Sequence, residues 1–200
     1  MDRKTTRLII GFGCRRRRGK DTCCLMAKEL LEDWGYKVRL DAFATSLKEG
    51  IGKGVFGLTD EQLYGEAKFE VDPFWGLTPR DILQRGGTEA MRNTFGQDIW
   101  VQTVERRAAV DPETSVLLSD VRFPNEVEGL RRLGGYAVLV DRPLDLIPAA
   151  TSPEEDRHAS ETSLDHFTDW DFRIENAGTL EDLREEVRRV LIVLSSSRSF

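Results

Sequence analysis

A short basic stretch near the amino terminus carries the residues whose types and spacing could do chemistry. In "IIGFGCRRRRGKDTCC" (Ile9–Cys24), glycines bracket four arginines, and Gly19-Lys20-Asp21-Thr22 follows directly. This order is close to the phosphate-binding pattern G-x-x-x-x-G-K-[ST], in which backbone N–H groups and a lysine hold phosphate oxygens. A helix that begins after Gly19 adds the positive end of its dipole. The stretch therefore predicts a nucleotide phosphate site, with Lys20 reaching the outer phosphates.

Two positions depart from that pattern. Its first glycine would stand at Cys14, whereas the glycines here are Gly11 and Gly13. Asp21 takes the usual Ser/Thr position, with Thr22 next to it. A carboxylate beside phosphates is repulsive unless Mg²⁺ lies between them, so we expect Asp21 and Thr22 to face Mg²⁺ directly or through water.

A second acidic residue supports the same site. Asp120 ends the apolar run "VLLSD", at the carboxyl end of a predicted strand, and this is the edge where open α/β sheets bind ligands. Asp120 is therefore a third candidate for Mg²⁺ or its water shell. The alternative is that Asp120 caps the helix predicted in "FPNEVEGL".

The elements that must position these residues alternate between short β-rich runs and amphipathic helices. Strands are expected at Thr6–Phe12, Lys37–Phe43, Ser115–Asp120, Tyr136–Arg142 and Asp171–Asn176. Helices are expected from Lys20 to Gly35, from Pro79 to about Asn93, from about Gln97 to Ala109, from Pro124 to the glycines at 134–135, and from Leu180 to Leu194. Capping boxes at Thr78 and Thr179 mark two of the starts. The alternation predicts a doubly wound α/β fold with a mainly five-stranded parallel sheet and flanking helices.

Length and composition predict one domain spanning residues 1–200. Two segments interrupt the alternation, and we interpret them as a substrate-binding insert at about 44–110 and a lid at about 143–168. The net charge of −6 disfavours a general nucleic-acid binder, and no apolar run is long enough to cross a membrane. Three cysteines form no disulfide framework, and the amino terminus lacks a secretory signal, so we expect a cytoplasmic protein.

Several motifs in this order carry a resemblance to a known family. "GKDT", "TPRDILQRGGTE", "FGQDIWV", "SDVRFPNEVEGLRRLGG", "RHASET" and "IENAGTLEDL" together resemble the bacteriophage deoxynucleoside monophosphate kinases, relatives of adenylate kinase in the phosphate-loop kinase superfamily. The similarity runs from about Arg7 to Val193. It implies phosphorylation of a deoxynucleoside monophosphate to the diphosphate by ATP with Mg²⁺, in the host cytoplasm if the protein is phage-encoded, and it is consistent with a homodimer.

The resemblance also implies roles for individual residues. Those that would contact phosphates or the metal are Arg17, Gly19, Lys20, Asp21 and Thr22. Those that would line the monophosphate site are Leu47, Lys48, Arg80, Gly87, Thr88, Thr94, Phe95 and Trp100. Arg122 and Glu126 would lie between the two nucleotides, and Asn176 would meet adenine.

Physical chemistry adds to this implied site. Phe95 and Trp100 offer rings for stacking a base, with Gly96 interrupting the helix between them, although either ring could instead belong to a core. Arg80 suits the acceptor phosphate because a guanidinium matches phosphate oxygens. Arg142 and Arg157 are candidates to close over the transferring group, and solvated charge is the alternative for Arg157.

Two other functions fit parts of the sequence. Another small-molecule kinase, for a nucleoside or a coenzyme precursor, would keep Lys20 and Asp120 but need a carboxylate base for an uncharged acceptor, and Asp41 could serve. A nucleic-acid or nucleotide-binding module would use the arginine run with "WVQTVERR" and show salt-sensitive DNA binding.

Overall fold

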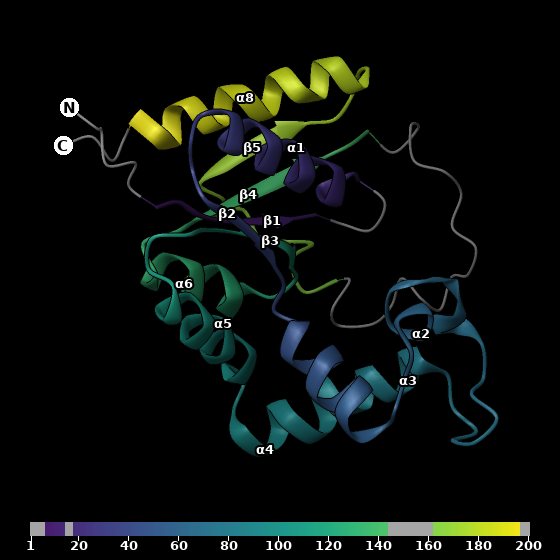
Figure 1. Cartoon of the computed structure of the whole chain (residues 1–200). Coiled ribbons are helices and arrows are strands. Elements are labelled where there is room, and N and C mark those ends of the chain that lie inside the picture. Colours follow the sequence, from purple (N-terminus) through teal and green to yellow (C-terminus); the bar gives the residue numbers. More distant parts are fainter. Residues whose placement is uncertain (1–6, 15–17, 144–161, 197–200) are drawn as a thin grey trace. The chain divides into compact units, whose positions relative to one another are not determined.

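The computed structural model describes residues 7–14, 18–143 and 162–196 (Figure 1). The chain divides into two compact units: unit 1 comprises Met1–Ala42 and Arg107–Phe200, and unit 2 comprises Phe43–Arg106. The insert expected at 44–110 therefore lies mostly in unit 2. Of the lid expected at 143–168, residues 144–161, including Arg157, are outside the described part, as is Arg17.

Unit 1 is built on a sheet of five strands that lie parallel, which confirms the predicted fold class. The strands are β1 (Ile9–Gly13), β2 (Val38–Asp41), β3 (Ser115–Val121), β4 (Tyr136–Asp141) and β5 (Phe172–Glu175). Their order across the sheet is β2-β3-β1-β4-β5. The central strand β1 is buried over its whole length, as its near-continuous apolar run predicts for a strand covered on both faces.

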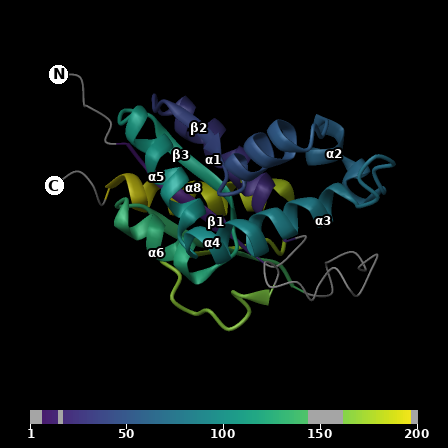
Figure 2. The same cartoon turned by 90° about the horizontal axis from the view of Figure 1, so that it is seen from below.

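Helices cover both faces of this sheet (Figures 1 and 2). On one face, α1 (Lys20–Asp33) packs against α8 (Leu180–Ser196), and Leu30 and Leu191 meet Phe12 and Val138 in the main core. On the other face lies α6 (Pro124–Arg132), which approaches β1 closely because a β-carbon at Gly11 would overlap the Leu130 side chain. No helix within the described ranges is both long and apolar enough to cross a bilayer.

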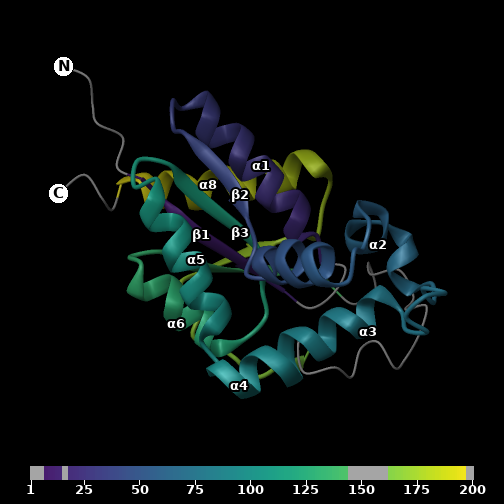
Figure 3. The ribbon, with the colours of Figure 1, turned by 60° about the horizontal axis from the view of Figure 1, so that its bottom comes forward.

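Unit 2 is helical. Its elements are the π-helices η1 (Leu47–Val55) and η3 (Arg85–Arg92), the 3₁₀ helix η2 (Glu66–Phe69), and the α-helices α2 (Asp60–Tyr64), α3 (Pro79–Gln84), α4 (Asn93–Phe95) and the start of α5 (Ile99–Val110), which ends in unit 1. The predicted capping box is present, because Thr78 Oγ1 accepts a hydrogen bond from the backbone N–H of Asp81 at 3.1 Å. The helical run continues from there through Phe95, two residues beyond the prediction, with wider π turns in η3 (Figure 3).

Candidate active site

The phosphate loop ends at a residue whose backbone requires glycine. Gly19 has a φ of 92°, in the left-handed region, and α1 begins at the next residue. Among the described residues, no side chain caps the first turn of α1. Backbone N–H groups of a first turn have no acceptor within their own helix, and the helix dipole makes this end positive. The start of α1 therefore presents the donors and the charge that a phosphate group needs.

Lys20 and Asp21 bring opposite charges to this helix start. Lys20 Nζ lies 2.9 Å from Oδ2 and 3.1 Å from Oδ1 of Asp21. The Lys20 side chain is 18% exposed and that of Asp21 is 71% exposed. Thr22 follows in the same turn, so an ammonium, a carboxylate and a hydroxyl stand together where the loop enters the helix.

Asn176, after the end of β5, and Asp141, at the end of β4, contact the part of the phosphate loop just before α1. Asn176 Nδ2 donates to the carbonyl oxygen of Arg18 at 3.0 Å, and its side chain lies against Gly19. The backbone N–H of Asn176 donates to the carbonyl oxygen of Asp141 at 2.7 Å, and the Arg18 guanidinium forms an ion pair with the Asp141 carboxylate. The contact of Asn176 with adenine stays a prediction, and in the structure its buried side chain bonds the carbonyl oxygen of Arg18.

Cys14 stands where the pattern has its first glycine, and its sulfur faces the loop. Burial raises the pKa of the Cys14 thiol, against the opposing effects of the Lys20 ammonium and of the backbone N–H groups of Lys20 and Arg18. These groups come from the loop and from the start of α1. The Cys14 side chain therefore lies beside Arg18 and Lys20.

The donors expected to hold Mg²⁺ fit that ion. Burial, with a smaller contribution from the carboxylates of Asp21 and Asp120, raises the pKa of the Cys24 thiol to about 12, so both carboxylates lie near this one thiol. Carboxylate and hydroxyl oxygens, as in Asp21, Asp120 and Thr22, are the kind of ligand that Mg²⁺ prefers, and Mg²⁺ usually completes such a set with water and substrate phosphates. No cluster of three or more His, Cys, Asp or Glu side chains that could hold a metal occurs in the described part of the chain.

The turn after β3 explains part of "SDVRFPNE". Glu126 is 2% exposed, and its Oε2 accepts hydrogen bonds from the backbone N–H groups of Arg122 at 2.8 Å and Phe123 at 3.1 Å. Glu126 thus serves as the acidic acceptor at the start of α6, the role considered for Asp120. The bond from its backbone N–H to Glu126 therefore holds Arg122 just after the carboxyl end of β3.

Arg142 follows β4 at the same edge of the sheet. Its Nε is buried and has no hydrogen-bond partner within residues 7–14, 18–143 and 162–196. A buried donor of this kind requires an acceptor. An oxyanion held at the strand ends would supply one.

The structure places the expected acceptor-site residues in unit 2 and brings three of them together. A β-carbon on Gly87 would lie 2.8 Å from Leu47 Cδ2, so the glycine allows η3 to approach η1. Trp100 Nε1 donates to the carbonyl oxygen of Gly87 at 3.1 Å. These contacts join the starts of η1 and α5 to the middle of η3.

Two cations of this set lie on aromatic rings. Lys48 Nζ is 4.2 Å from the centre of the Tyr64 ring, and the Arg80 guanidinium carbon is 5.8 Å from that of Phe69. Contacts of this kind stabilise a cation without neutralising it. The ring contacts thus add to the stability of two cations that were expected to line the monophosphate site.

The expectation that Phe95 and Trp100 both offer a stacking face meets a mixed outcome. Gly96, with a φ of 101°, ends α4 between them, as expected. The Phe95 side chain is 65% exposed, and Thr94 beside it is exposed too. Trp100 is only 5% exposed, because its ring is used in the interior of unit 2. The alternative of a core residue is therefore the one observed for Trp100.

Residues 66–187 match the family model described as deoxynucleotide monophosphate kinase. The chain belongs to this family. It is 30% identical over 197 residues to a protein named putative deoxynucleotide monophosphate kinase from Acanthamoeba polyphaga mimivirus, a match that covers 90% of this chain and 94% of the relative. It is 38% identical over 74 residues to the deoxynucleoside-5'-monophosphate kinase of Escherichia phage T5, covering 37% of this chain and 30% of the relative.

The fold matches that of a solved small-molecule kinase. Shikimate kinase from Acinetobacter baumannii aligns with a TM-score of 0.53 and 16% identity, covering 98% of this chain and 97% of that structure. This likeness shows the fold. Membership of the deoxynucleotide monophosphate kinase family makes the protein a nucleotide kinase and a phosphotransferase.

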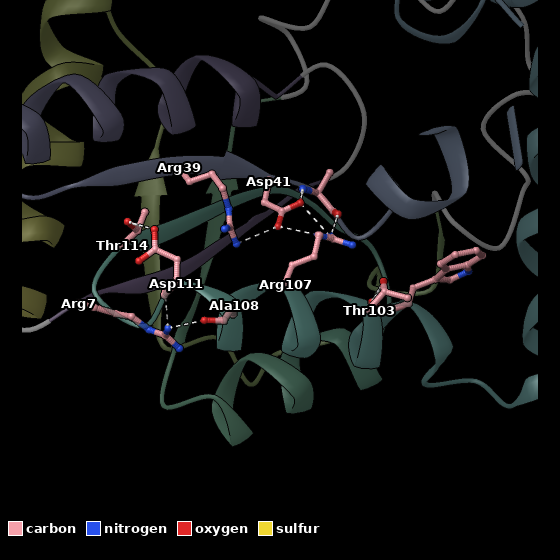
Figure 4. A network of polar contacts seen from close by, with 10 residues as sticks. Arg7, Arg39, Asp41, Thr103, Arg107, Ala108, Asp111 and Thr114 are labelled. Atoms are coloured by element: carbon pink, nitrogen blue, oxygen red, sulfur yellow. Dashed lines mark hydrogen bonds and ion pairs between the residues drawn. The ribbon is translucent and has the colours of Figure 1, made fainter. Parts of the chain in front are cut away.

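In this kinase, Asp41 is engaged in a way that does not suit a general base. Its side chain is 3% exposed, and its carboxylate oxygens accept hydrogen bonds from Arg107 Nε at 3.0 Å and Arg107 Nη2 at 2.9 Å (Figure 4). A base must have an oxygen facing the proton that it removes. The alternative of a kinase with an uncharged acceptor therefore loses its proposed base.

Three residues of the kinase that contact cations near the candidate site were not predicted from the sequence: Asp141, Tyr64 and Phe69. Asp141 pairs with Arg18, the Tyr64 ring lies under Lys48, and the Phe69 ring lies near Arg80. The two members of each contact are more than ten positions apart in the sequence, so no local pattern links them. The one available signal for Asp141 is its position at the end of a predicted strand, the same signal that identified Asp120.

Proposed function

We propose that the protein transfers the γ-phosphoryl group of ATP to the phosphate of a deoxynucleoside monophosphate, giving ADP and the deoxynucleoside diphosphate. The observation that carries this proposal is the start of α1, which follows β1 after a loop: Gly19 has a left-handed backbone, Lys20 comes next, and no described side chain caps the first turn. Ligands bind at this edge of open α/β sheets. The family match and the names of the two viral relatives support a deoxynucleoside monophosphate as the acceptor.

In the proposed reaction, an oxygen of the acceptor phosphate forms a bond to the γ-phosphorus, and the bond from that phosphorus to the β–γ bridging oxygen breaks. The electron pair leaves with ADP. The acceptor phosphate is already ionised near neutral pH, so no side chain has to remove a proton. Catalysis then consists of holding two anionic groups in line and stabilising the charge that moves between them.

The side chains at the strand ends would provide that stabilisation. Lys20 and the N–H groups of the first turn of α1 would bind the outer phosphates, with Arg17 in support. Arg122 and Arg142 would bind the transferring group, because each follows a strand at this edge and the buried Nε–H of Arg142 has no acceptor among the described residues. Asp21, Thr22 and Asp120 would hold Mg²⁺, which neutralises phosphate charge and orients the phosphates when bound.

Unit 2 would bind the acceptor. Lys48 and Arg80 are cations held on aromatic rings, and they suit the acceptor phosphate. The exposed ring of Phe95 would stack on the base, and Thr88 and Thr94 would supply hydroxyl groups. Leu47, Gly87 and Trp100 would shape this site from within, because their contacts fix η1 and η3 to each other.

The setting of the reaction is part of the proposal. The viral relatives support action in the cytoplasm of an infected host. A homodimer is also proposed, and light scattering of the purified protein checks it. A stable complex with nucleic acid is not part of the proposed function, because the net charge of the chain is −6.

A coupled assay of ADP release tests the proposal directly. The purified full chain is incubated with ATP and each of the four common deoxynucleoside monophosphates, with Mg²⁺ or with excess EDTA, and with the matching nucleosides in parallel. We expect Mg²⁺-dependent ADP release with at least one monophosphate, and the diphosphate as product. Turnover of nucleosides alone would overturn the assignment of the acceptor, and ADP release without phosphorylated product would overturn transfer itself.

A further inference from the structure

The chain passes between its two units at two places, and both lie beside one arginine. It leaves unit 1 after Ala42 and returns at Arg107. The Arg107 guanidinium donates to both carboxylate oxygens of Asp41, through Nε at 3.0 Å and Nη2 at 2.9 Å. Arg107 Nη2 also donates to the carbonyl oxygen of Ala42 at 2.8 Å. The last residues before unit 2 and the first residue after it are thus bonded directly (Figure 4).

Further contacts hold this junction to the sheet. The Asp41 carboxylate also accepts from the backbone N–H of Ala42 at 2.7 Å and lies 3.5 Å from the Arg39 guanidinium. Arg7 Nη1, at the start of the chain segment that enters β1, donates to the carbonyl oxygen of Ala108 at 2.7 Å. Both sides of the junction are therefore fixed, Asp41 by the edge strand β2 and α5 by Arg7 (Figure 4).

The geometry of the Asp41–Arg107 pair holds the two chain segments that it joins in a fixed arrangement. A guanidinium and a carboxylate in this two-bond arrangement fix orientation as well as distance. The Asp41 side chain is 3% exposed and that of Arg107 is 26% exposed, so the pair is partly shielded from water and from screening by salt. An exposed pair elsewhere on the surface would fix neither chain segment so firmly.

We propose that Asp41 and Arg107 are positioning residues for the acceptor: they form a clamp that holds together the chain segments on either side of unit 2, so that the segments leading to Lys48 and Trp100 keep one arrangement within unit 2. This inference rests on the proposed function of unit 2. Lys48 lies seven positions after Asp41, and Trp100 lies seven positions before Arg107 in the same helix, so both segments that leave the clamp lead directly into the proposed acceptor site. Small errors in the placement of reacting groups lower rates by up to about a hundredfold.

The test compares Arg107→Gln, Arg107→Lys and Asp41→Asn in the full chain. For Arg107→Gln and Asp41→Asn we expect kcat to fall about ten- to a hundredfold with the KM for ATP unchanged. Release of ADP per diphosphate formed should rise above one, because water replaces a misplaced acceptor. Arg107→Lys should recover part of the rate. The double variant should lose no more than the worse single variant, because both changes break the same pair.

A matched control comes from another arginine of unit 1. Arg131 Nη1 lies 2.7 Å from Asp169 Oδ2, and its Nη2 lies 3.1 Å from Asp171 Oδ1, away from both junctions. Arg131→Gln should leave kcat and the ADP-to-product ratio unchanged. Equal effects of Arg131→Gln and Arg107→Gln would overturn the proposal, as would full, tightly coupled transfer by Arg107→Gln.

Hydrogen exchange distinguishes a local change at the junction from a general loss of folding. Hydrogen exchange of Arg107→Gln, whose side chain is partly exposed, should be faster at residues 41–46 and 99–108 and unchanged in β1 and β4. Unfolding of the whole chain, or unchanged exchange at the junction, would contradict a local clamp. If the wild-type protein phosphorylates no monophosphate, the proposed function fails; if it does and Arg107→Gln does equally well, only the clamp fails.

Discussion

The amide of Asn176 and the carbonyl oxygen of Arg18, 3.0 Å apart, join the end of the last strand to the phosphate loop. The bond lies directly behind Gly19, the residue with the left-handed backbone at the start of α1. A loop that binds phosphate through its backbone needs that backbone fixed before the ligand arrives. Asn176 provides this support from a part of the chain that no phosphate-binding pattern includes.

Replacement of Asn176 by alanine should therefore weaken ATP binding about tenfold, since one hydrogen bond to a buried group contributes about 1–2 kcal/mol. Titration calorimetry with ATP measures this. Asn93→Ala, at an exposed position in α4, is the control and should change nothing. If Asn176→Ala instead alters only the preference for ATP over GTP, the side chain reads adenine and the loop does not depend on it.

Lys20→Ala should reduce kcat by at least a hundredfold, because Lys20 is the cation at the start of α1 and stabilises charge on the transferring phosphate. The thermal midpoint should stay within about 2 °C, since the ion pair of Lys20 is with Asp21, whose side chain is exposed. Stopped-flow or steady-state kinetics and calorimetry provide the two readings. Lys28→Ala, in the same helix and paired with Glu32, is the matched control. An unchanged rate would remove Lys20 from the catalytic residues.

Glu126→Ala should cost about 1–3 kcal/mol of the free energy of unfolding. It removes the buried carboxylate that accepts from the backbone N–H groups of Arg122 and Phe123, and these donors would remain without it. Urea unfolding measures the loss, with Glu128→Ala, exposed on the same helix, as control. A variant with full stability but no activity would show that Glu126 acts on the nucleotides, as the family resemblance implied.

Trp100→Phe should lower the free energy of unfolding by about 1–2 kcal/mol, because it leaves the Gly87 carbonyl oxygen without its indole donor inside unit 2. It should also raise the KM for the acceptor while the KM for ATP stays constant. Trp75→Phe is a close control, since Trp75 Nε1 also donates to a backbone carbonyl oxygen, that of Phe56 at 3.0 Å, at a more exposed position. A larger effect of Trp75→Phe on acceptor KM would contradict the proposed role of Trp100.

The two adjacent cysteines predict how stability depends on alkaline pH. Burial raises the pKa of Cys23 and of Cys24 to about 12 each, whereas thiols in an unfolded chain titrate near pH 8.5. Between these values the unfolded state binds fewer protons than the folded state, so the free energy of unfolding falls as pH rises. The maximum slope is about 1.4 kcal/mol per pH unit for each thiol.

Urea unfolding at pH 7.5, 9 and 10.5 measures this dependence. The variant Cys23→Ala/Cys24→Ala should show a shallower fall than the wild type, because other groups titrate equally in both proteins. Equal slopes would show that these thiols do not couple to folding in this range.

Much of unit 1 could be predicted because its sequence signals are local. Apolar runs of four to seven residues correspond to β1, β3 and β4, and the glycine-lysine sequence after β1 identified the start of α1. Asp120 could be assigned to the ligand-binding edge because parallel strands bring their carboxyl ends to one side. These inferences needed only the order of residues and the geometry of a parallel sheet.

The roles of Asn176, Glu126 and Trp100 could not be predicted in the same way. Each side chain bonds a backbone group, and a backbone group has no sequence signature. The π-helix η1 was missed because Gly50, Gly52 and Gly54 lower helix propensity and interrupt the apolar period. Packing against the rest of unit 2 stabilises this helix, since Gly52 lies directly against the Leu63 side chain.

The position of Ala42 and Arg107 side by side has a consequence for how such enzymes diversify. The sixty-four residues Phe43–Arg106 leave and rejoin the rest of the chain at neighbouring points. They can therefore be exchanged without a change in the order of strands in the central sheet. New acceptor preferences could thus be acquired by grafting one contiguous cassette, provided that the graft retains a carboxylate and a guanidinium at its borders.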